Sequence, residues 1–229
     1  PWRSLLASSD GNEWFARYLD RNRGAGQGAL VPVLLSMAIQ HFGVVRPVAI
    51  DFEYGPAHFR NEPTLFDVLG STLSDQGGAL DDVLLEATTA RVLAHPEAPP
   101  AYDWIIPAST LPRRVTMPRG VEPMGATFMR IDVDRMPKGN SIDLDLEWEA
   151  GSRFRWAVMK LDDHGKVVGA VGVPALERAR KLTVEVRKLE GVSRVLVVGL
   201  NTGDPAFPWL PDDPPAPPHG YELGVYEGE

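Results

Sequence analysis

The residue types that could hold a metal ion are few in this chain and scattered along it. The five histidines are His41, His58, His95, His164 and His219. No two of them lie four residues apart, the spacing at which a helix presents a pair of zinc ligands, and the HExxH sequence of zinc peptidases is absent. His58 and Glu62 are four apart, but Pro63 indicates that a helix starts between them. A solvated loop histidine is therefore the favoured interpretation.

A run of acidic residues is the second group with metal-binding chemistry. Its members are Asp132, Asp134, Asp143, Asp145, Glu147 and Glu149. Carboxylates placed side by side on adjacent strands could form a calcium site, but calcium loops usually draw ligands from turns and backbone carbonyls. The favoured interpretation is the water-facing side of strands. The segment Asp162-Asp163-His164-Gly165 is likewise interpreted as a hairpin turn rather than a ligand cluster.

Neither phosphate binding nor nucleophilic catalysis has a signature in the sequence. Segment 24–28 contains closely spaced glycines but no preceding strand and no lysine. No serine lies in a GxSxG elbow, and the absence of cysteine excludes thiolate chemistry and disulfides. A catalytic triad assembled in space is neither excluded nor favoured. From motifs alone we predict no catalytic residue, no cofactor-binding residue and no metal ligand.

The second half of the chain has the alternation of half-buried strands. Segment 141–149 alternates four apolar residues with five polar or acidic ones, and segment 181–187 repeats the arrangement. Segments 154–161 and 195–200 are apolar at nearly every position, as in central strands covered on both faces, and a second sheet packed face to face would provide that cover. Turn residues separate these runs, and roughly seven strands at spacings of about 8 to 12 residues predict a β-sandwich.

The first half has helical patterns interrupted by glycine and proline. Helices are expected over about 11–21, 28–42, from Asn61 to Leu73, and over about 80–93, where Asp81 and Asp82 complement the helix dipole. Segment 96–100, Pro-Glu-Ala-Pro-Pro, ends helical structure. From Tyr102 to Val121 no period is present, so an extended connector packed against both halves is expected.

These patterns predict an α+β protein with an N-terminal helical unit and a C-terminal antiparallel β-sandwich of about seven strands. The expected domains are a helical unit over 1–100, a packed connector over 101–121 and the sandwich over 122–229. With 44% hydrophobic residues the chain is globular, and its net charge of −8 shows no basic face for nucleic acid. No apolar run is long enough to span a bilayer.

Several stretches resemble parts of a known group of proteins. Gly11–Asp20, a glycine-rich break and then Ala29–Leu35 resemble the helices that follow the zinc site in gluzincin-type metallopeptidase-like proteins. Segments of large exported proteins of myxobacteria and relatives, predicted to be peptidases, resemble Asn61–Leu69, Leu111–Arg114, Val121–Thr127, Phe154–Ala157 and Val197–Asn201. In gluzincins the HExxH helix and the downstream glutamate precede the aromatic helix, so no catalytic residue carries over to this chain.

The resemblance implies the non-catalytic C-terminal region of an exported zinc-peptidase-like protein. Its helices would complete the peptidase lobe, its sandwich would stabilise that lobe or bind a partner, and zinc would belong only to the longer parent. The chain opens at Pro1 without methionine or a leader segment, which fits a fragment of a longer product or a mature form. The expected partners are the upstream part of the same protein and polypeptide or surface carbohydrate, and the expected location is exported or cell-surface.

Two alternatives come from the residues. One is a free-standing sandwich that binds carbohydrate or protein, for example through Trp209 in a proline-rich loop, although that ring is more simply a plug folded back on the domain. The other is an enzyme of unrecognised type with a site at the seam between the units. Four residues could converge there: Glu53, Tyr54, His58 and Asp103.

Overall fold

A computed structural model describes part of the first half of the chain and most of the second half. The described residues are 15, 17–22, 70, 73–74, 78–94, 102–117, 119–134, 136, 140–176, 179–203 and 217–228. Among them residues 15 and 17–22 are helical, in agreement with the helix expected over 11–21. Residues 70 and 73 are helical within the one expected from Asn61 to Leu73, and residue 74 extends it. The helix expected over 28–42 lies outside the described residues.

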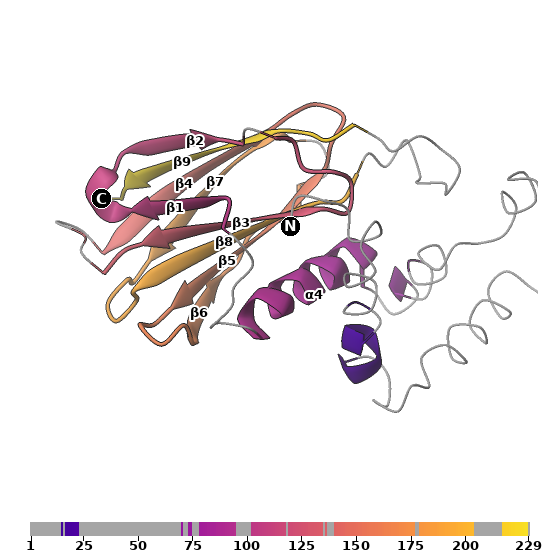
Figure 1. The fold of residues 1–229 in the computed structure, drawn as a ribbon, viewed down its shortest axis with the longest axis horizontal. Coiled ribbons are helices and arrows are strands. Elements are labelled where there is room, and N and C mark those ends of the chain that lie inside the picture. Colours follow the sequence, from indigo (N-terminus) through magenta and orange to yellow (C-terminus); the bar gives the residue numbers. More distant parts are fainter. Residues whose placement is uncertain are drawn as a thin grey trace, which may run out of the picture.

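The strands form two sheets packed face to face (Figure 1). The five-stranded sheet has the order β1-β3-β8-β5-β6, and its strands are β1 (Trp104–Pro107), β3 (Ala126–Asp132), β8 (Arg194–Asn201), β5 (Phe154–Leu161) and β6 (Val167–Val171). The four-stranded sheet has the order β2-β9-β4-β7, from β2 (Arg113–Thr116), β9 (Tyr221–Glu227), β4 (Ser141–Trp148) and β7 (Lys181–Arg187). The predicted β-sandwich is confirmed.

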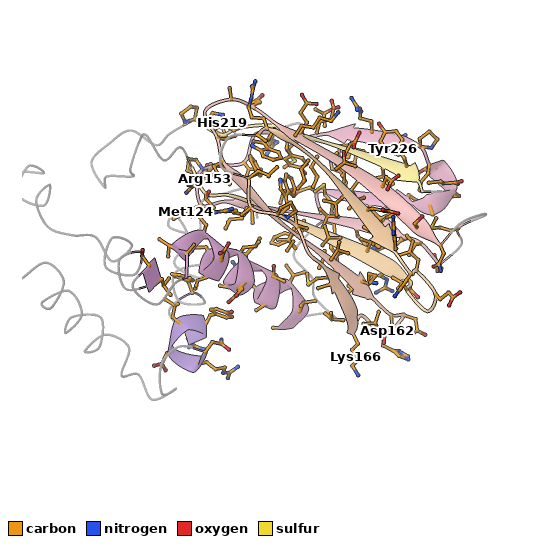
Figure 2. The ribbon with its side chains drawn as sticks, turned by 180° about the vertical axis from the view of Figure 1, so that it is seen from behind. Met124, Arg153, Asp162, Lys166, His219 and Tyr226 are labelled. Atoms are coloured by element: carbon orange, nitrogen blue, oxygen red, sulfur yellow. The ribbon has the colours of Figure 1, made fainter. Side chains whose placement is uncertain are left out.

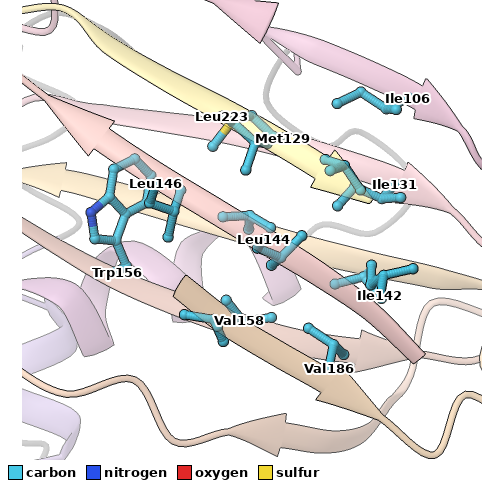
Figure 3. Close-up of a cluster of buried hydrophobic side chains, with 14 of the residues drawn as sticks. Ile106, Met129, Ile131, Ile142, Leu144, Leu146, Trp156, Val158, Val186 and Leu223 are labelled. Carbon is cyan, nitrogen blue, oxygen red and sulfur yellow. The ribbon is translucent and has the colours of Figure 1, made fainter. Parts of the chain in front are cut away.

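Alternation along the strands places one apolar set between the sheets. Ile142, Leu144 and Leu146 of β4 are fully buried there, opposite Met129 and Val158 of the five-stranded sheet (Figure 3). Each such side chain removed from water stabilises the fold by roughly 1.5–3 kcal/mol before the entropy of ordering the chain is subtracted. The intervening residues Asp143, Asp145 and Glu147 therefore point to the outer face of the four-stranded sheet.

The central strands β3, β8 and β5 of the five-stranded sheet are buried on both faces, and their second face is covered by a helix and not by a third sheet. Val195 and Val197 of β8 face the four-stranded sheet, whereas Leu196 and Val198 belong to a second core with Leu84 of α4 (Leu80–Ala94). The same core includes Phe15, Leu19, Leu73, Val83, Ala87, Val92, Ala126, Phe128, Met159, Leu161 and Leu200. The apolar runs predicted as central strands are thus explained by a three-layer arrangement of helix, sheet and sheet (Figure 1).

The segment expected as a connector over 101–121 contributes two strands, a difference from the prediction. Seven strands, β3 to β9, lie within 122–229 as predicted, and β1 and β2 bring the total to nine in the described residues. β1 pairs with β3 in parallel, so the sandwich is not purely antiparallel, and β2 pairs with β9 antiparallel. Each has only four residues, too few to show a period, and the 3₁₀ helix Ala108–Thr110 between them lets the chain pass from one sheet to the other.

α4 confirms the helix predicted over 80–93, and its described side chains share one core with the sheet rather than forming a separate unit. The domain boundary at residue 100 stays a prediction. Two acids, Asp81 and Asp82, lie in the first turn as expected for the helix dipole. Among the described residues no helix has the length and apolar content needed to cross a membrane.

Asp81 has a second role that the sequence pattern did not indicate. Its Oδ2 lies 2.7 Å from Nη2 of Arg153 and 3.5 Å from Nε of Arg155, which joins the helix layer to the start of β5. The Arg155 side chain is only 7% exposed and that of Asp81 only 14%. Burial raises the pKa of Asp81 above its ordinary value, although the two guanidinium groups act in the opposite direction. The carboxylate is thus a partly desolvated ion partner between two layers.

We predict that Asp81→Asn lowers the free energy of unfolding by about 2 kcal/mol, because the buried guanidinium of Arg155 and the partly buried one of Arg153 lose the carboxylate that they share. Asp82→Asn is the matched control, since the exposed Asp82 occupies the same helical turn, and it should change the free energy by less than about 0.5 kcal/mol. Urea unfolding followed by tryptophan fluorescence measures both. Equal effects of the two substitutions would contradict the ion-pair assignment.

Because its pKa is raised, Asp81 binds its proton more readily in the folded chain than in the unfolded chain. The contribution of this group to the free energy of unfolding therefore decreases as the pH rises through the window just above the ordinary carboxyl pKa. We predict that the stability advantage of the wild type over Asp81→Asn decreases as the pH rises from the ordinary carboxyl pKa of about 4. Unfolding at a series of pH values checks this, and a shift of opposite sign would contradict it.

Candidate binding face

The described residues among those singled out for metal chemistry do not come together. His219 and the hairpin from Asp162 to Lys166 lie at opposite ends of the two packed sheets (Figure 2). His164 in that hairpin is exposed beside Asp163, and Nδ1 of His219 lies 3.7 Å from Oε2 of Glu149. His41, His58 and His95 lie outside the described residues. Within the part of the chain that the structure describes, no group of three or more metal-ligating side chains could hold an ion.

The acidic run is divided among different places in the fold. Asp143, Asp145 and Glu147 share the outer face of β4, roughly 7 Å apart from one to the next, as expected for alternate strand positions. Asp132 belongs to β3 in the other sheet, where its Oδ1 lies 2.8 Å from Nε of Arg130. Glu149 accepts a hydrogen bond from the backbone N–H of Gly220 at 2.8 Å. The favoured interpretation, a water-facing strand surface, fits this arrangement, and Asp134 lies in a turn.

The seam residues are represented by Asp103 alone, because Glu53, Tyr54 and His58 lie outside the described residues, as does Trp209. Oδ2 of Asp103 accepts hydrogen bonds from the Thr127 hydroxyl at 2.7 Å and from the Phe128 N–H at 3.1 Å. The Thr127 hydroxyl also lies 2.6 Å from the buried Tyr221 hydroxyl across the sandwich, and burial raises the pKa of that phenol. Asp103 therefore joins β1 to β3 and is engaged in structural bonds.

The outer face of the four-stranded sheet carries many polar side chains and one aromatic side chain, Tyr226. We call it the binding face, and it consists of Arg114 on β2, Glu222, Gly224 and Tyr226 on β9, Asp143, Asp145 and Glu147 on β4, and Lys181, Thr183, Glu185 and Arg187 on β7. The register lines these residues up in rows across the strands. One row runs from Arg114 through Gly224 and Asp145 to Thr183.

Tyr226 is the aromatic side chain of the binding face, and it lies down along its own strand. A Cβ placed on Gly224, two residues earlier on the same face, would stand 2.8 Å from Cε2 and 2.9 Å from the hydroxyl of Tyr226. The absence of a side chain at Gly224 thus leaves the space that the ring fills. Nη2 of Arg114 donates to the Tyr226 hydroxyl at 3.3 Å, and Nη1 of the same guanidinium lies 2.6 Å from Oε1 of Glu222.

The other side chains of the binding face supply donors and acceptors around the ring. The Thr183 hydroxyl donates to Oδ1 of Asp145 at 2.7 Å, and Nζ of Lys181 lies 4.0 Å from Oδ2 of the same carboxylate. Asp143 is in register with Tyr226 on one side and Glu185 on the other. Glu185 pairs with Arg187, and that pair lowers the pKa of the Glu185 carboxyl. The contacts of Thr183 and Lys181 with Asp145 run between β7 and β4, whereas the Glu185–Arg187 pair lies within β7.

The sequence predicted that the β4 residues of this face are acidic and exposed to water, but it did not identify Tyr226 as part of the same face. The available signal was the Gly-x-Tyr spacing of Gly224 and Tyr226 in a strand, because residues two apart lie on the same face. The partner strand β2 was missed, so Arg114 could not be placed beside the ring.

No protein-family model matches the chain, and no curated protein matches it. Among solved structures, the pre-peptidase C-terminal domain of collagenase from Bacillus anthracis is 10% identical over 56% of this chain and 99% of that chain, with a TM-score of 0.32. The chitosan-binding module 1 of a chitosanase/glucanase from Paenibacillus sp. IK-5 is 16% identical over 51% and 78%, with a TM-score of 0.27. The CBM22-1 xylan-binding domain of Paenibacillus barcinonensis Xyn10C is 14% identical over 44% and 65%, with a TM-score of 0.25. At these TM-scores the likenesses assign no ligand.

We predict that Gly224→Ala displaces the Tyr226 ring and lowers the free energy of unfolding by about 1 kcal/mol, because the new methyl group occupies the space of the ring. The same substitution in a Tyr226→Ala background should have almost no such effect, since the three nearest atoms to the added Cβ all belong to Tyr226. Urea unfolding of the four chains gives the coupling. A Gly224→Ala effect of equal size in both backgrounds would contradict the arrangement.

Proposed function

We propose that this protein is a binding module that takes extended polysaccharide on the outer face of its four-stranded sheet. The observation that carries the proposal is the Tyr226 ring, held along the sheet surface over Gly224 and beside Arg114. A sugar ring presents C–H groups on its faces and hydroxyls around its rim, so it matches an aromatic surface surrounded by hydrogen-bonding side chains.

The polar side chains of the binding face support the same ligand class. Carboxylates such as Asp143 and Asp145 accept hydrogen bonds from hydroxyls, and the guanidinium of Arg114 donates them. Charge-assisted hydrogen bonds of this kind add direction to the contact that the ring makes. The four strands hold the side chains at fixed spacings, which reduces the entropy lost when a ligand binds. We therefore propose that the binding face holds the polysaccharide by non-covalent contacts.

The resemblance to exported zinc-peptidase-like proteins supplies a separate proposal about the context of the chain. In that proposal the module is the C-terminal part of a longer exported protein whose zinc and catalytic residues lie upstream. The zinc content and peptidase activity of the full-length natural product test it, beside those of this 229-residue chain. A natural product without metal and without peptidase activity would refute the peptidase parent and leave the binding face unaffected.

The first experiment for the proposed function measures retention of the full chain on insoluble xylan, a neutral polymer, and on chitosan, a cationic one. Titration calorimetry with soluble fragments of the retained polymer then measures the affinity. We predict that Tyr226→Ala weakens binding about tenfold, equivalent to about 1.4 kcal/mol. The matched control is Ile105→Ala, which removes a 49% exposed apolar side chain from the other sheet and should leave the affinity unchanged.

Two results would refute the polysaccharide proposal. One is a wild-type chain that is retained by neither polymer nor by an anionic one such as polygalacturonate. The other is a Tyr226→Ala chain that binds as tightly as the wild type. A wild-type chain that binds only polypeptide would point to the protein-binding form of the module.

A further inference from the structure

The charges of the binding face do not cancel, and the excess is negative. The face has three basic side chains and five carboxylates. Each base lies beside a carboxylate of the same face, in the pairs Arg114–Glu222, Arg187–Glu185 and Lys181–Asp145. The side chains of the other two carboxylates, Asp143 and Glu147, make no ion pair or hydrogen bond with the described residues. The face therefore keeps two negative charges that no base within it neutralises.

Asp143 is the carboxylate of these two that lies beside the Tyr226 ring. It is half-buried and directly opposite Tyr226 in the pairing of β4 with β9, where the Cβ atoms of opposite residues are about 4.5–5.5 Å apart. The guanidinium of Arg114 reaches the hydroxyl of the same ring from β2, on the other side of β9. Glu185 raises the pKa of Arg187, and Asp143 adds a smaller effect in the same direction without pairing with it. One side of the ring thus has a paired cation and the other has an unpaired carboxylate.

The like charges on this face cost stability that solubility alone would not require. In an antiparallel pair of strands, like charges directly opposite each other are destabilising. Asp143 is opposite Glu185, and Glu147 is opposite Glu222. Glu147 has the basic Lys181 as its neighbour on the other adjacent strand, whereas Asp143 has a base opposite it on neither strand. A cation bound beside Asp143 would offset this repulsion.

From this arrangement we infer that the polysaccharide taken by the binding face carries free amino groups, and that Asp143 selects it. The inference rests on the proposed function: a protonated amine of one sugar residue lies between the Asp143 carboxylate and the Tyr226 ring. The carboxylate accepts charge-assisted hydrogen bonds from the amine, and the ring attracts a cation to its face. A metal ion would need several oxygen ligands, which one carboxylate does not supply. The net charge of −8 also favours the approach of a cationic polymer.

Titration calorimetry of the full chain with two soluble probes tests the inference. The probes are an oligomer of glucosamine and the same oligomer with every amine acetylated, which differ in charge but not in backbone. The wild type should bind the glucosamine oligomer at least about tenfold more tightly than the acetylated one, and added salt should reduce this preference. Asp143→Asn should weaken binding of the glucosamine oligomer about tenfold and that of the acetylated oligomer by less than about threefold.

Two controls separate the role of Asp143 from loss of folding and from a change in total charge. Asp143→Asn should not lower the free energy of unfolding, because it removes the repulsion with Glu185. Asp163→Asn removes the same charge from the exposed hairpin between β5 and β6, outside the binding face, and should keep the wild-type preference for the glucosamine oligomer.

Failure of this inference can be told apart from failure of the proposed function. If the wild type binds both oligomers equally, or if Asp143→Asn leaves the preference unchanged, the amine inference is overturned while polysaccharide binding stands. If the wild type binds neither oligomer, nor xylan, nor polygalacturonate, the proposed function fails and the inference fails with it. Binding of oligolysine as tight as that of the glucosamine oligomer would show that the face takes polycations of any kind, and would overturn the assignment to an amino sugar.

Discussion

Burial of the central strands of the five-stranded sheet on both faces is the constraint on which the rest of this structure depends. Strands such as β8 have apolar side chains at successive positions, so an uncovered face would leave Leu196, Val198 and Leu200 in water. The four-stranded sheet covers one face and α4 covers the other. The ion pairs of Asp81 with Arg153 and Arg155 lie at the border of the helix layer, where they orient the helix as well as attach it. Helix and sandwich are thus parts of one folded body in the described residues.

The four-stranded sheet differs from the five-stranded sheet because only one of its faces is buried in a core. Strict alternation along β4 sends Ile142, Leu144 and Leu146 inward and three carboxylates outward. An outward face of this kind needs only to be soluble, and charges alone would achieve that. A tyrosine laid over a glycine, with an arginine bonded to its hydroxyl and to a glutamate, is a more specific arrangement than solubility requires. The proposed function follows from that difference.

Much of the sandwich could be predicted because period-two alternation is a local property of the chain. β4 and β7 were recognisable in this way, and α4 had both a helical pattern and an acidic first turn. β1 and β2 could not be predicted, since four-residue strands derive their structure from the partner strands and not from their own pattern. The hydrogen bond from Arg114 of β2 to the Tyr226 hydroxyl joins residues 112 positions apart, so a local sequence pattern could not reveal it. The double burial of the central strands was predicted, but the identity of the second cover required tertiary structure.

The central claim is that ligand binds on the outer face of the four-stranded sheet, and backbone amide chemical shifts of the full chain test it most directly. Titration with a soluble oligosaccharide should shift the resonances of Arg114, Asp145, Thr183 and Tyr226, which lie in neighbouring positions across β2, β9, β4 and β7. The resonances of α4 on the far side of the five-stranded sheet should stay in place. Shifts confined to α4 or to the sandwich ends, with those four residues unaffected, would contradict the account.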